Sequence, residues 1–543
     1  MKIIYFVKNN WIILLIVFLA LVLRLWGIQY GLPGLFVGDE KSLVGGALKM
    51  IYQQNIFPVL EPDVFRLLYY PTLIPWLYLI FFVPYVVFVY LTGQWISIAE
   101  LRDFFIINPS VFFLMARVMS AFFATGAVGL IYLVGKKIFS QRASLLAALL
   151  YAVSFLPVHQ GHFSKHWNFG IFFALLIFYF ALKISKEPQT KNYLKAGFIT
   201  GLAFFSNYIS AIYGLIVVLV HFFLPNQSIR EKFFSKKLWV FLMIALLISS
   251  LAVLIYPQEF DRLVLGEDST VLQVKSLNGF LGVSFEILKT LYYIVTFVFL
   301  FSLIGYVFLF FKDRKLFFIL AFIPLLSPFL YYFLLHFEPR YVLLFLPILA
   351  LVAGYGLSQF LELFRIRFKW LVFLISLMII ILPLKNAIDF GRLISQADTR
   401  NLANDWIKGN IPIGSKIITN SWEFNLIRNQ ECLNHQQQTN NMSLRSRDYV
   451  MMENSFIDSY CVWPLDLIKI LPSNVDEYQY YLIDEYTIRR NVNLGEELME
   501  RAELIKRFEG SKFDPTEQIS TMFVWQRLQD RKLGPTVEIY KLK

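Results

Sequence analysis

Long apolar runs constrain this sequence more than any other feature. Runs of roughly 17 to 25 residues, the length that crosses a bilayer as an α-helix, recur from Trp11 to about Lys385. The chain has 543 residues, of which 57% are hydrophobic and only 16% charged. Lipid offers no partner for backbone polar groups, so spanning segments of this kind are helical. The sequence therefore predicts an all-α polytopic membrane domain.

The positions of the basic residues predict how the chain is oriented. The formal net charge is +12, but Lys and Arg gather in short loops between apolar runs. This pattern marks cytoplasmic loops, so we exclude nucleic acid as a partner. The basic segments are the N-terminus with Lys2 and Lys8, followed by residues 136–142, 183–192, 230–237, 312–315 and 365–369. Their alternation predicts a multi-pass protein of the cytoplasmic membrane with about eleven crossings, a cytoplasmic N-terminus and an extracytoplasmic C-terminal domain.

Two segments do not fit a simple alternation. Pro71–Leu91 is left over when the crossings are counted, and Pro75 and Pro84 interrupt it. Because proline breaks helices, we expect this segment to be re-entrant or to lie in the interface; a pair of full crossings is the alternative. Ala196–Leu224 is long for one helix and short for two, and both its ends are cytoplasmic. We expect two short helices that meet near Asn207.

The composition changes to that of a soluble domain from about Asp398. We divide the chain into a transmembrane domain, residues 1–390 with its first outer loop at 29–110, and a small α/β domain, residues 391–543. Its two cysteines, Cys432 and Cys461, could pair outside the cytoplasm. The predicted elements are an amphipathic helix at Asp398–Ile411, strands at Lys416–Asn420, Tyr478–Asp484 and Val537–Leu542, and a largely helical segment at Glu496–Ile505.

Two adjacent carboxylates, Asp39 and Glu40, follow directly on the first apolar run. From Asp39 onwards the apolar residues form one helical stripe, which predicts an amphipathic helix on the outer surface. Asp39 would be its N-cap, and Glu40 would be a first-turn acid favoured by the helix dipole. A carboxylate fixed in this way also suits a general base, so the capping and catalytic interpretations both stand.

Two further polar segments are expected on the same outer side. In the first, His159, His162 and His166 are spaced so that they could share a helical face and bind a metal, although they match no zinc spacing. Lys165 lies among them and could bind an anionic phosphate. The second segment places His336 and Arg340 at the start of an apolar run, where Arg340 either snorkels to the headgroups or holds a phosphate.

The ordered set of segments resembles the membrane-embedded GT-C glycosyltransferases, in the branch of protein O-mannosyltransferases and lipid A aminoarabinose transferases. The segments that carry the resemblance are GDEKSLVGGALKM (38–50), YYPTLIPWLY (69–78), RVMSAFFATGAVGLIYLVGKKIFSQRASLLAALLYAVS (117–154), HFSKHWNFGIFFALL (162–176), GFITGLAFFSNYISAIYGL (197–215), PRYVLLFLPILALVAGYGL (339–357) and DTRNLANDWIKGNIPIGSKI (398–417). Together they cover most of the chain, and their order is more specific than any one of them.

The resemblance implies that a sugar passes from a polyprenyl-phosphate donor to an acceptor hydroxyl on a protein, lipid or glycan outside the membrane. It implies that Asp39 is the general base, with Glu40 as its neighbour. Arg340 would hold the donor phosphate, helped by Lys165, His162 or His336. Many relatives have a second acid after the HF pair; here Lys165 and His166 take its place, which argues against a metal bridged by two acids but leaves a divalent metal cofactor as an alternative. The alternatives are a lipid or sugar transporter or flippase, and a catalytically inactive scaffold that binds glycans.

Overall fold

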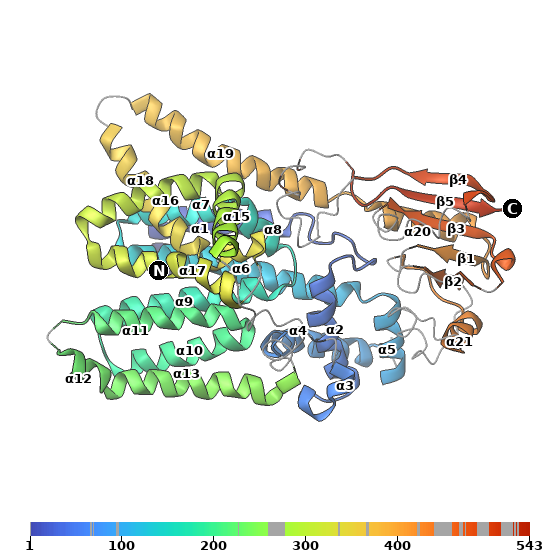
Figure 1. Ribbon diagram of the computed structural model, residues 1–543, viewed down its shortest axis with the longest axis horizontal. Helices are drawn as coiled ribbons and strands as arrows, with labels where there is room; N and C mark the ends of the chain where they lie inside the picture. The colour runs from blue at the N-terminus through green and yellow to red at the C-terminus, as the bar shows by residue number, and fades with distance from the viewer. Residues whose placement is uncertain are drawn as a thin grey trace.

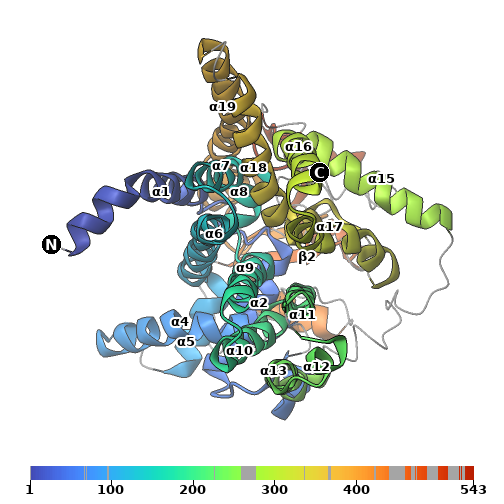
Figure 2. The same cartoon turned by 90° about the vertical axis from the view of Figure 1, so that its left-hand side faces the viewer.

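The computed structural model shows a helical body with a small sheet domain at one end (Figure 1). It describes the chain except residues 1, 66–67, 69, 94–96, 226, 259–276, 335–336, 365–368, 421–423, 439–458, 466–470, 473, 486–498, 512–524, 526–527 and 529–531. The helices of the body run side by side (Figure 2), and the two chain ends that Figure 1 marks lie towards opposite ends of the molecule. The expected fold class, a mostly helical apolar domain followed by a small C-terminal α/β domain, is confirmed.

The body is built from long apolar helices and shorter connecting ones. The long helices are α1 (Lys2–Leu25), α6 (Ser110–Ile138), α9 (His166–Lys186), α10 (Thr190–Ser206), α13 (Lys236–Ile255), α16 (Thr296–Lys312), α17 (Arg314–Leu334), α18 (Leu346–Phe364) and α19 (Lys369–Ile394). Two shorter apolar helices, α7 (Gln141–Val153) and α11 (Gly214–Phe222), run beside them. Among the described residues, six helices are long and apolar enough to cross a membrane, or up to eight if each bent pair is one span. About eleven crossings therefore stays a prediction.

Small residues allow the central helices to approach closely. A Cβ on Gly354 of α18 would lie 2.5 Å from the backbone carbonyl oxygen of Ala143 in α7. A Cβ on Gly305 of α16 would lie 2.2 Å from the carbonyl oxygen of Val352 in α18. Membrane helices associate through such close backbone contacts because apolar burial gives little driving force in lipid. Glycines in these runs therefore hold α7, α16 and α18 together.

Helices α4 (Leu73–Leu91) and α15 (Leu277–Ile294) lie across the direction of the bundle, at the end that faces the sheet. Figure 1 shows α4 nearly end-on, whereas in Figure 2 it lies lengthwise and the bundle helices are end-on. By length and apolar composition, however, Leu73–Leu91 is one of the six helices that could cross a membrane, so an interfacial position for Pro71–Leu91 stays a prediction. The expected break at the prolines is wrong: Pro75 occupies the first turn, where its missing N–H costs nothing, and the helix continues through Pro84.

The segment at Ala196–Leu224 breaks where the sequence predicts. Helix α10 ends at Ser206, and Asn207 leaves the helical region with φ −160° and ψ 109°. Its side-chain oxygen accepts from the N–H of Ile209 and starts the 3₁₀ helix η2 (Tyr208–Tyr213), which leads into α11. Asparagine favours such breaks because its side chain competes for backbone groups.

The C-terminal domain is a five-stranded mixed sheet with helices at its side. The elements are α20 (Thr399–Asn410), β1 (Lys416–Thr419), α21 (Gln430–Gln438), β2 (Cys461–Pro464), η5 (Val475–Glu477), β3 (Tyr480–Asp484), β4 (Ala502–Phe508) and β5 (Val537–Leu542). The strand order is β2-β1-β3-β5-β4; β1 pairs in parallel with β2 and β3, and β5 pairs antiparallel with β3 and β4. Cys432 and Cys461 form a disulfide.

Most predicted elements of this domain are confirmed, and one is wrong. The helix at Asp398–Ile411 and the strands at Lys416–Asn420, Tyr478–Asp484 and Val537–Leu542 correspond to α20, β1, β3 and β5. The end of Glu496–Ile505 forms the start of strand β4 instead of a helix. Pairing with β5 at the edge of the sheet outweighs the local helix propensity of this charged segment.

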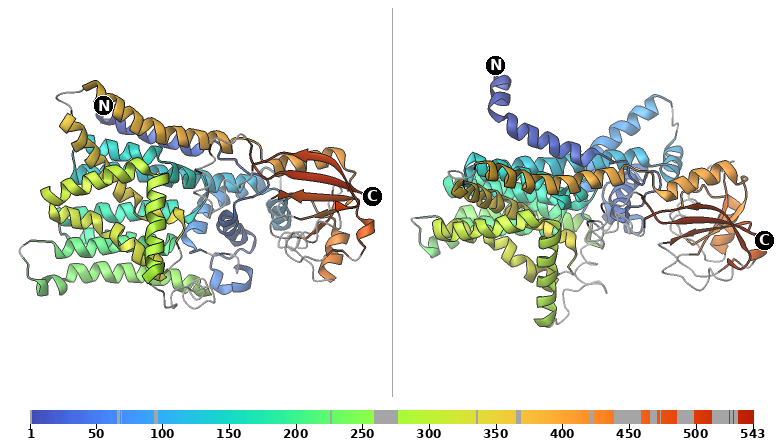
Figure 3. Two further views of the ribbon diagram at one scale, coloured as in Figure 1. Left: turned by 45° about the horizontal axis from the view of Figure 1, so that its top comes forward. Right: turned by 90° about the horizontal axis from the view of Figure 1, so that it is seen from above.

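The sheet domain contacts the connection between α1 and Asp39 (Figure 3). The hydroxyl of Tyr30 donates to Asp398 at 3.0 Å, and the amide of Asn401 donates to the carbonyl oxygen of Leu32 at 3.0 Å. The guanidinium of Arg400 lies 3.5 Å from the centre of the Phe36 ring. These contacts join the start of α20 to the loop that leads to Asp39.

Candidate active site

Asp39 lies in the first turn of α2 (Gly38–Tyr52), directly after the loop that contacts the sheet domain. The helix begins at Gly38 with Val37 as its N-cap, so the prediction that Asp39 caps the helix is wrong. The apolar stripe is confirmed: Leu43, Val44 and Ala47 are fully buried, and α2 packs against α4, α5 (Ile98–Ile107) and α6. This packing fixes the direction of the first turn, where the helix dipole favours a carboxylate.

Two cations from distant segments meet Asp39. Nζ of Lys165 lies 3.8 Å from Oδ2 of Asp39, and Nη1 of Arg340 lies 3.6 Å from the same oxygen. Lys165 belongs to the connection between α8 (Phe155–Gly161) and α9, and Arg340 to η4 (Pro339–Leu344) before α18. Nε of Arg340 also lies 2.8 Å from Oε2 of Glu338. The structure thus brings together three of the residues that the sequence selected. It adds Glu338, to which the sequence analysis assigned no role.

This cluster balances two carboxylates against two cations at low exposure. The side chain of Lys165 is fully buried and that of Asp39 is 13% exposed. Burial lowers the pKa of Lys165, and the nearby Asp39 opposes this effect. Burial also acts against the charge of Arg340, but Asp39 and Glu338 outweigh it and raise the pKa of the guanidinium. An arrangement of this kind presents positive charge at one side of a carboxylate that stays partly accessible.

Glu40 is held in a separate, fully buried contact. Arg117 of α6 donates to both carboxylate oxygens of Glu40, at 2.9 and 2.7 Å, and its Nη1 donates to the carbonyl oxygens of Ile28 and Tyr30 at 2.7 Å. The N–H of Ser164 donates to Glu40 at 2.7 Å. Glu40 therefore ties α2 to α6 and to the segment that carries Lys165. This geometry argues for a structural role of Glu40 and against a catalytic one.

Arg117 is a residue that sequence reasoning missed. It is a single arginine within an apolar run, and ionisable side chains in such positions usually have a specific partner. That signal was present in the sequence, but it could not identify Glu40 as the partner.

The three histidines do not form a metal site in this structure. Among the residues that the structure describes, no group of three His, Cys, Asp or Glu side chains is placed to hold a metal. The ring nitrogens of His162 lie 2.8 Å and 3.0 Å from the carbonyl oxygens of Val158 and Trp26. Burial lowers the pKa of His162 to about 4, and both its nitrogens already contact backbone. The expectation that His162 binds the donor phosphate is therefore not supported.

The other two histidines contact aromatic or amide side chains. His159 lies beside Gln160, with 3.0 Å between its Nδ1 and the amide nitrogen. The ring of His166 stacks on Tyr70 with 4.4 Å between ring centres. His336 lies outside the described residues.

Aromatic side chains line the same region as Lys165 and Arg340. Next to His166, Trp167 packs against Tyr341 with 5.2 Å between ring centres. Tyr341 also directly follows Arg340 in η4. Such rings offer flat apolar surface beside the charged cluster. Sequence reasoning assigned no role to Tyr70, Trp167 or Tyr341, although all three fall in the segments that carry the GT-C resemblance.

Comparison with known proteins supports the resemblance stated above. Residues 110–256 match the family described as dolichyl-phosphate-mannose-protein mannosyltransferase. This stretch runs from α6 to the end of α13 and includes Arg117 and Lys165, so the resemblance to GT-C glycosyltransferases is confirmed there. No curated protein sequence matches the chain significantly.

Several solved structures are similar in overall fold. ArnT from Cupriavidus metallidurans, bound to undecaprenyl phosphate, is 11% identical with a TM-score of 0.48, and the match covers 98% of each chain. The oligosaccharyltransferase of Archaeoglobus fulgidus tethered to an acceptor peptide is 13% identical with a TM-score of 0.46. That match covers 94% of this chain and 74% of the other.

Proposed function

We propose that this protein transfers a sugar from a polyprenyl-phosphate donor to an acceptor hydroxyl at the outer face of the cytoplasmic membrane. The observation that carries the proposal is the cluster at Asp39, where a partly accessible carboxylate faces Lys165 and Arg340 from two other segments. The match of residues 110–256 to a mannosyltransferase family supports it.

The proposed reaction needs one base and one site for a leaving anion. The acceptor oxygen attacks the anomeric carbon and its proton passes to Asp39, while the bond from that carbon to the phosphate oxygen breaks. The bonding electron pair leaves with the polyprenyl phosphate, whose negative charge Lys165 and Arg340 stabilise. The donor phosphate would draw these two cations from Asp39 and so free the carboxylate to accept the proton.

The proposed location rests on the C-terminal domain and on the transverse helices. The Cys432–Cys461 disulfide favours an oxidising compartment. The domain lies at the same end of the bundle as α2, α4 and α15 (Figure 1). An orientation with this end outside, and with the basic loops in the cytoplasm, accounts for both features.

The test is a complementation experiment with Asp39→Asn. Cells that lack the gene receive the wild-type chain or the variant, and mass spectrometry measures their glycans and lipid-linked sugars. Removing a general base lowers turnover by roughly 10²- to 10⁴-fold, so the variant should accumulate the lipid-linked donor and lose the glycan product. Asp63→Asn, which changes an exposed acid in the same outer loop, is the matched control and should behave as wild type.

Two outcomes separate the alternatives. Wild-type glycan levels in Asp39→Asn cells would refute the role of Asp39 as base. A wild-type protein that binds the lipid-linked donor without any turnover would favour an inactive glycan-binding scaffold.

A further inference from the structure

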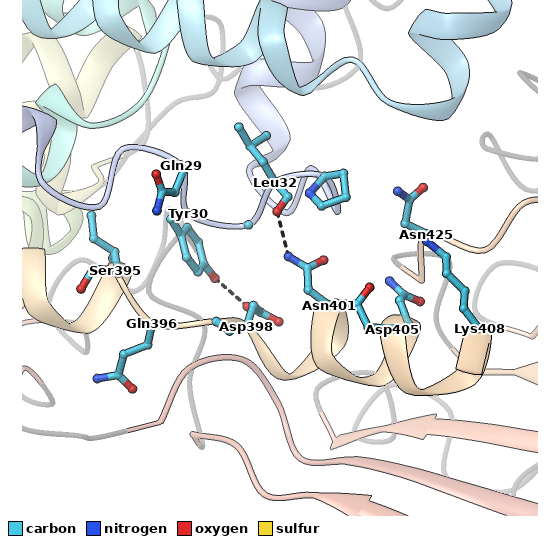
Figure 4. A pocket seen from close by; sticks show the side chains of 15 residues that line it. Gln29, Tyr30, Leu32, Ser395, Gln396, Asp398, Asn401, Asp405, Lys408 and Asn425 are labelled. Carbon is cyan, nitrogen blue, oxygen red and sulfur yellow. Dashed lines mark hydrogen bonds between the residues drawn. The ribbon is translucent and has the colours of Figure 1, made fainter. Parts of the chain in front are cut away.

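A polar cavity lies between the connection after α1 and the first helix of the sheet domain (Figure 4). Its volume is about 320 Å³, at the lower end of the range for small-molecule sites. One wall is the chain from Gln29 to Pro33 and the other is α20, with Asn425 at the side. The cavity contains none of the charged residues that surround Asp39.

The wall formed by α20 is a stripe of polar side chains. Asn401, Asn404, Asp405 and Lys408 recur at the spacing of one helical face and all line the cavity. The opposite face, with Ala403 and Ile407, packs into the core of the sheet domain. A polar helical face is usually only solvated, but Asn404 is 3% exposed and so differs from a surface residue.

The amide of Asn404 is the observation that points to a ligand. Neither its oxygen nor its nitrogen has a hydrogen-bond partner within the described part of the chain, and both atoms are buried. The side-chain oxygen of Asn401 is also buried without a hydrogen-bond partner in the described part of the chain, although the side-chain nitrogen donates to the carbonyl oxygen of Leu32. Buried amides are normally satisfied, so such a pair on one cavity wall needs a partner from outside the chain.

The chemistry of the wall selects the class of ligand. Amide side chains donate and accept at once, which matches hydroxyl groups that also do both. Asp405 and Lys408 offset each other, so the cavity lacks the excess positive charge that a phosphate requires. Leu32 and Pro33, both half-buried, add apolar surface suited to the C–H face of a ring.

We infer that this cavity binds a neutral hexopyranose unit through Asn401, Asn404 and Asn425. The site is separate from the charged cluster at Asp39, and sugar binding there does not depend on transfer activity. It gives the sheet domain a function in ligand recognition, since α20 supplies most of the polar groups.

The test measures binding of methyl α-D-mannopyranoside and methyl β-D-glucopyranoside to the full chain. The protein is placed in phospholipid nanodiscs, because maltoside detergents carry a competing sugar, and binding is followed by saturation-transfer NMR. At least one glycoside should bind saturably to the wild type. Asn404→Leu should raise its dissociation constant roughly ten-fold, since two hydrogen bonds are lost.

Matched variants make the result specific. Asn410→Leu changes an exposed amide on the same helix, outside the cavity, and should bind like the wild type. Asp39→Asn should also bind normally, which separates this inference from the proposed function. Asn425→Ala provides a second cavity variant if Asn404→Leu fails to fold. The inference is overturned if neither glycoside saturates the wild type, if the cavity variants bind unchanged, or if a neutral peptide displaces the glycosides.

Discussion

The buried pair of Arg117 and Glu40 allows a quantitative prediction about what holds the candidate site together. Arg117→Met removes a two-pronged ion pair and the two bonds that Arg117 donates to Ile28 and Tyr30. It leaves the carboxylate of Glu40, which is fully buried, with only the Ser164 contacts among its described hydrogen bonds. Breaking a buried pair from one side costs about 3–5 kcal/mol, so we expect a loss of that size in unfolding free energy.

The assay is reversible unfolding in mixed micelles, followed by circular dichroism. In the double variant Arg117→Met/Glu40→Gln, a neutral amide replaces the unpaired carboxylate of Glu40, and its oxygen can still accept a hydrogen bond from Ser164. Its total cost should be at least about 2 kcal/mol below the sum of the two single costs, as double-mutant cycles measure. The control is Arg507→Met, which breaks an exposed Arg–Glu pair in the sheet domain and should cost no more than about 1 kcal/mol.

Two results would refute this reasoning. One is an Arg117→Met protein as stable as the Arg507→Met control, because a buried carboxylate left without its partner would have lowered the unfolding free energy. The other is additive costs in the double variant, which would mean that Arg117 and Glu40 act independently. Either result would remove the argument that Glu40 positions the Lys165 segment.

Two further predictions concern charge and the disulfide. Because burial lowers the pKa of Lys165, the cation should be lost as pH rises at a lower pH than for a solvated lysine; the KM for the donor should therefore rise at alkaline pH, and Lys165→Arg should shift that rise to higher pH. An unchanged pH profile in Lys165→Arg would contradict this. The Cys432–Cys461 disulfide spans 29 residues, so the double variant Cys432→Ala/Cys461→Ala should lose about 3–4 kcal/mol of unfolding free energy in the sheet domain. In thermal unfolding of the full chain, the transition of the sheet domain should then occur at a lower temperature. A transition at the wild-type temperature would exclude a stabilising role of the disulfide.

Several features of the site could be predicted because their signals are local. The charge of Asp39 after an apolar run, and the Arg at the start of another, are visible in a few residues each. The pattern of basic loops then predicts that both lie at one membrane face, and in the structure the two side chains are neighbours, with 3.6 Å between Nη1 of Arg340 and Oδ2 of Asp39. The prediction failed where the signal depended on exact helix boundaries, as for the N-cap, which is Val37 and lies two residues before Asp39.

The roles of the histidines could not be read from spacing. His159, His162 and His166 share a short segment, but the helix ends at Gly161 and restarts at His166, so one continuous helical face does not exist. The backbone carbonyls that engage His162 come from α8 itself and from the chain after α1. Contacts of this kind depend on how segments pack, and spacing within one segment says nothing about them.

The sequence by itself determined the class of the protein, the change from an apolar helical body to a polar C-terminal part, and the positions of α20 and of strands β1, β3 and β5. These properties follow from run length, periodicity and composition, which can be read from short stretches of sequence without knowledge of the tertiary contacts. The predicted division at residues 390/391 falls inside α19 (Lys369–Ile394) and stays a prediction. Only the tertiary structure decided that Glu40 pairs with Arg117 while Asp39 faces Lys165 and Arg340. The two acids are neighbours in the chain, but successive residues on a helix point in directions about 100° apart, so one turns into the bundle and the other towards the site.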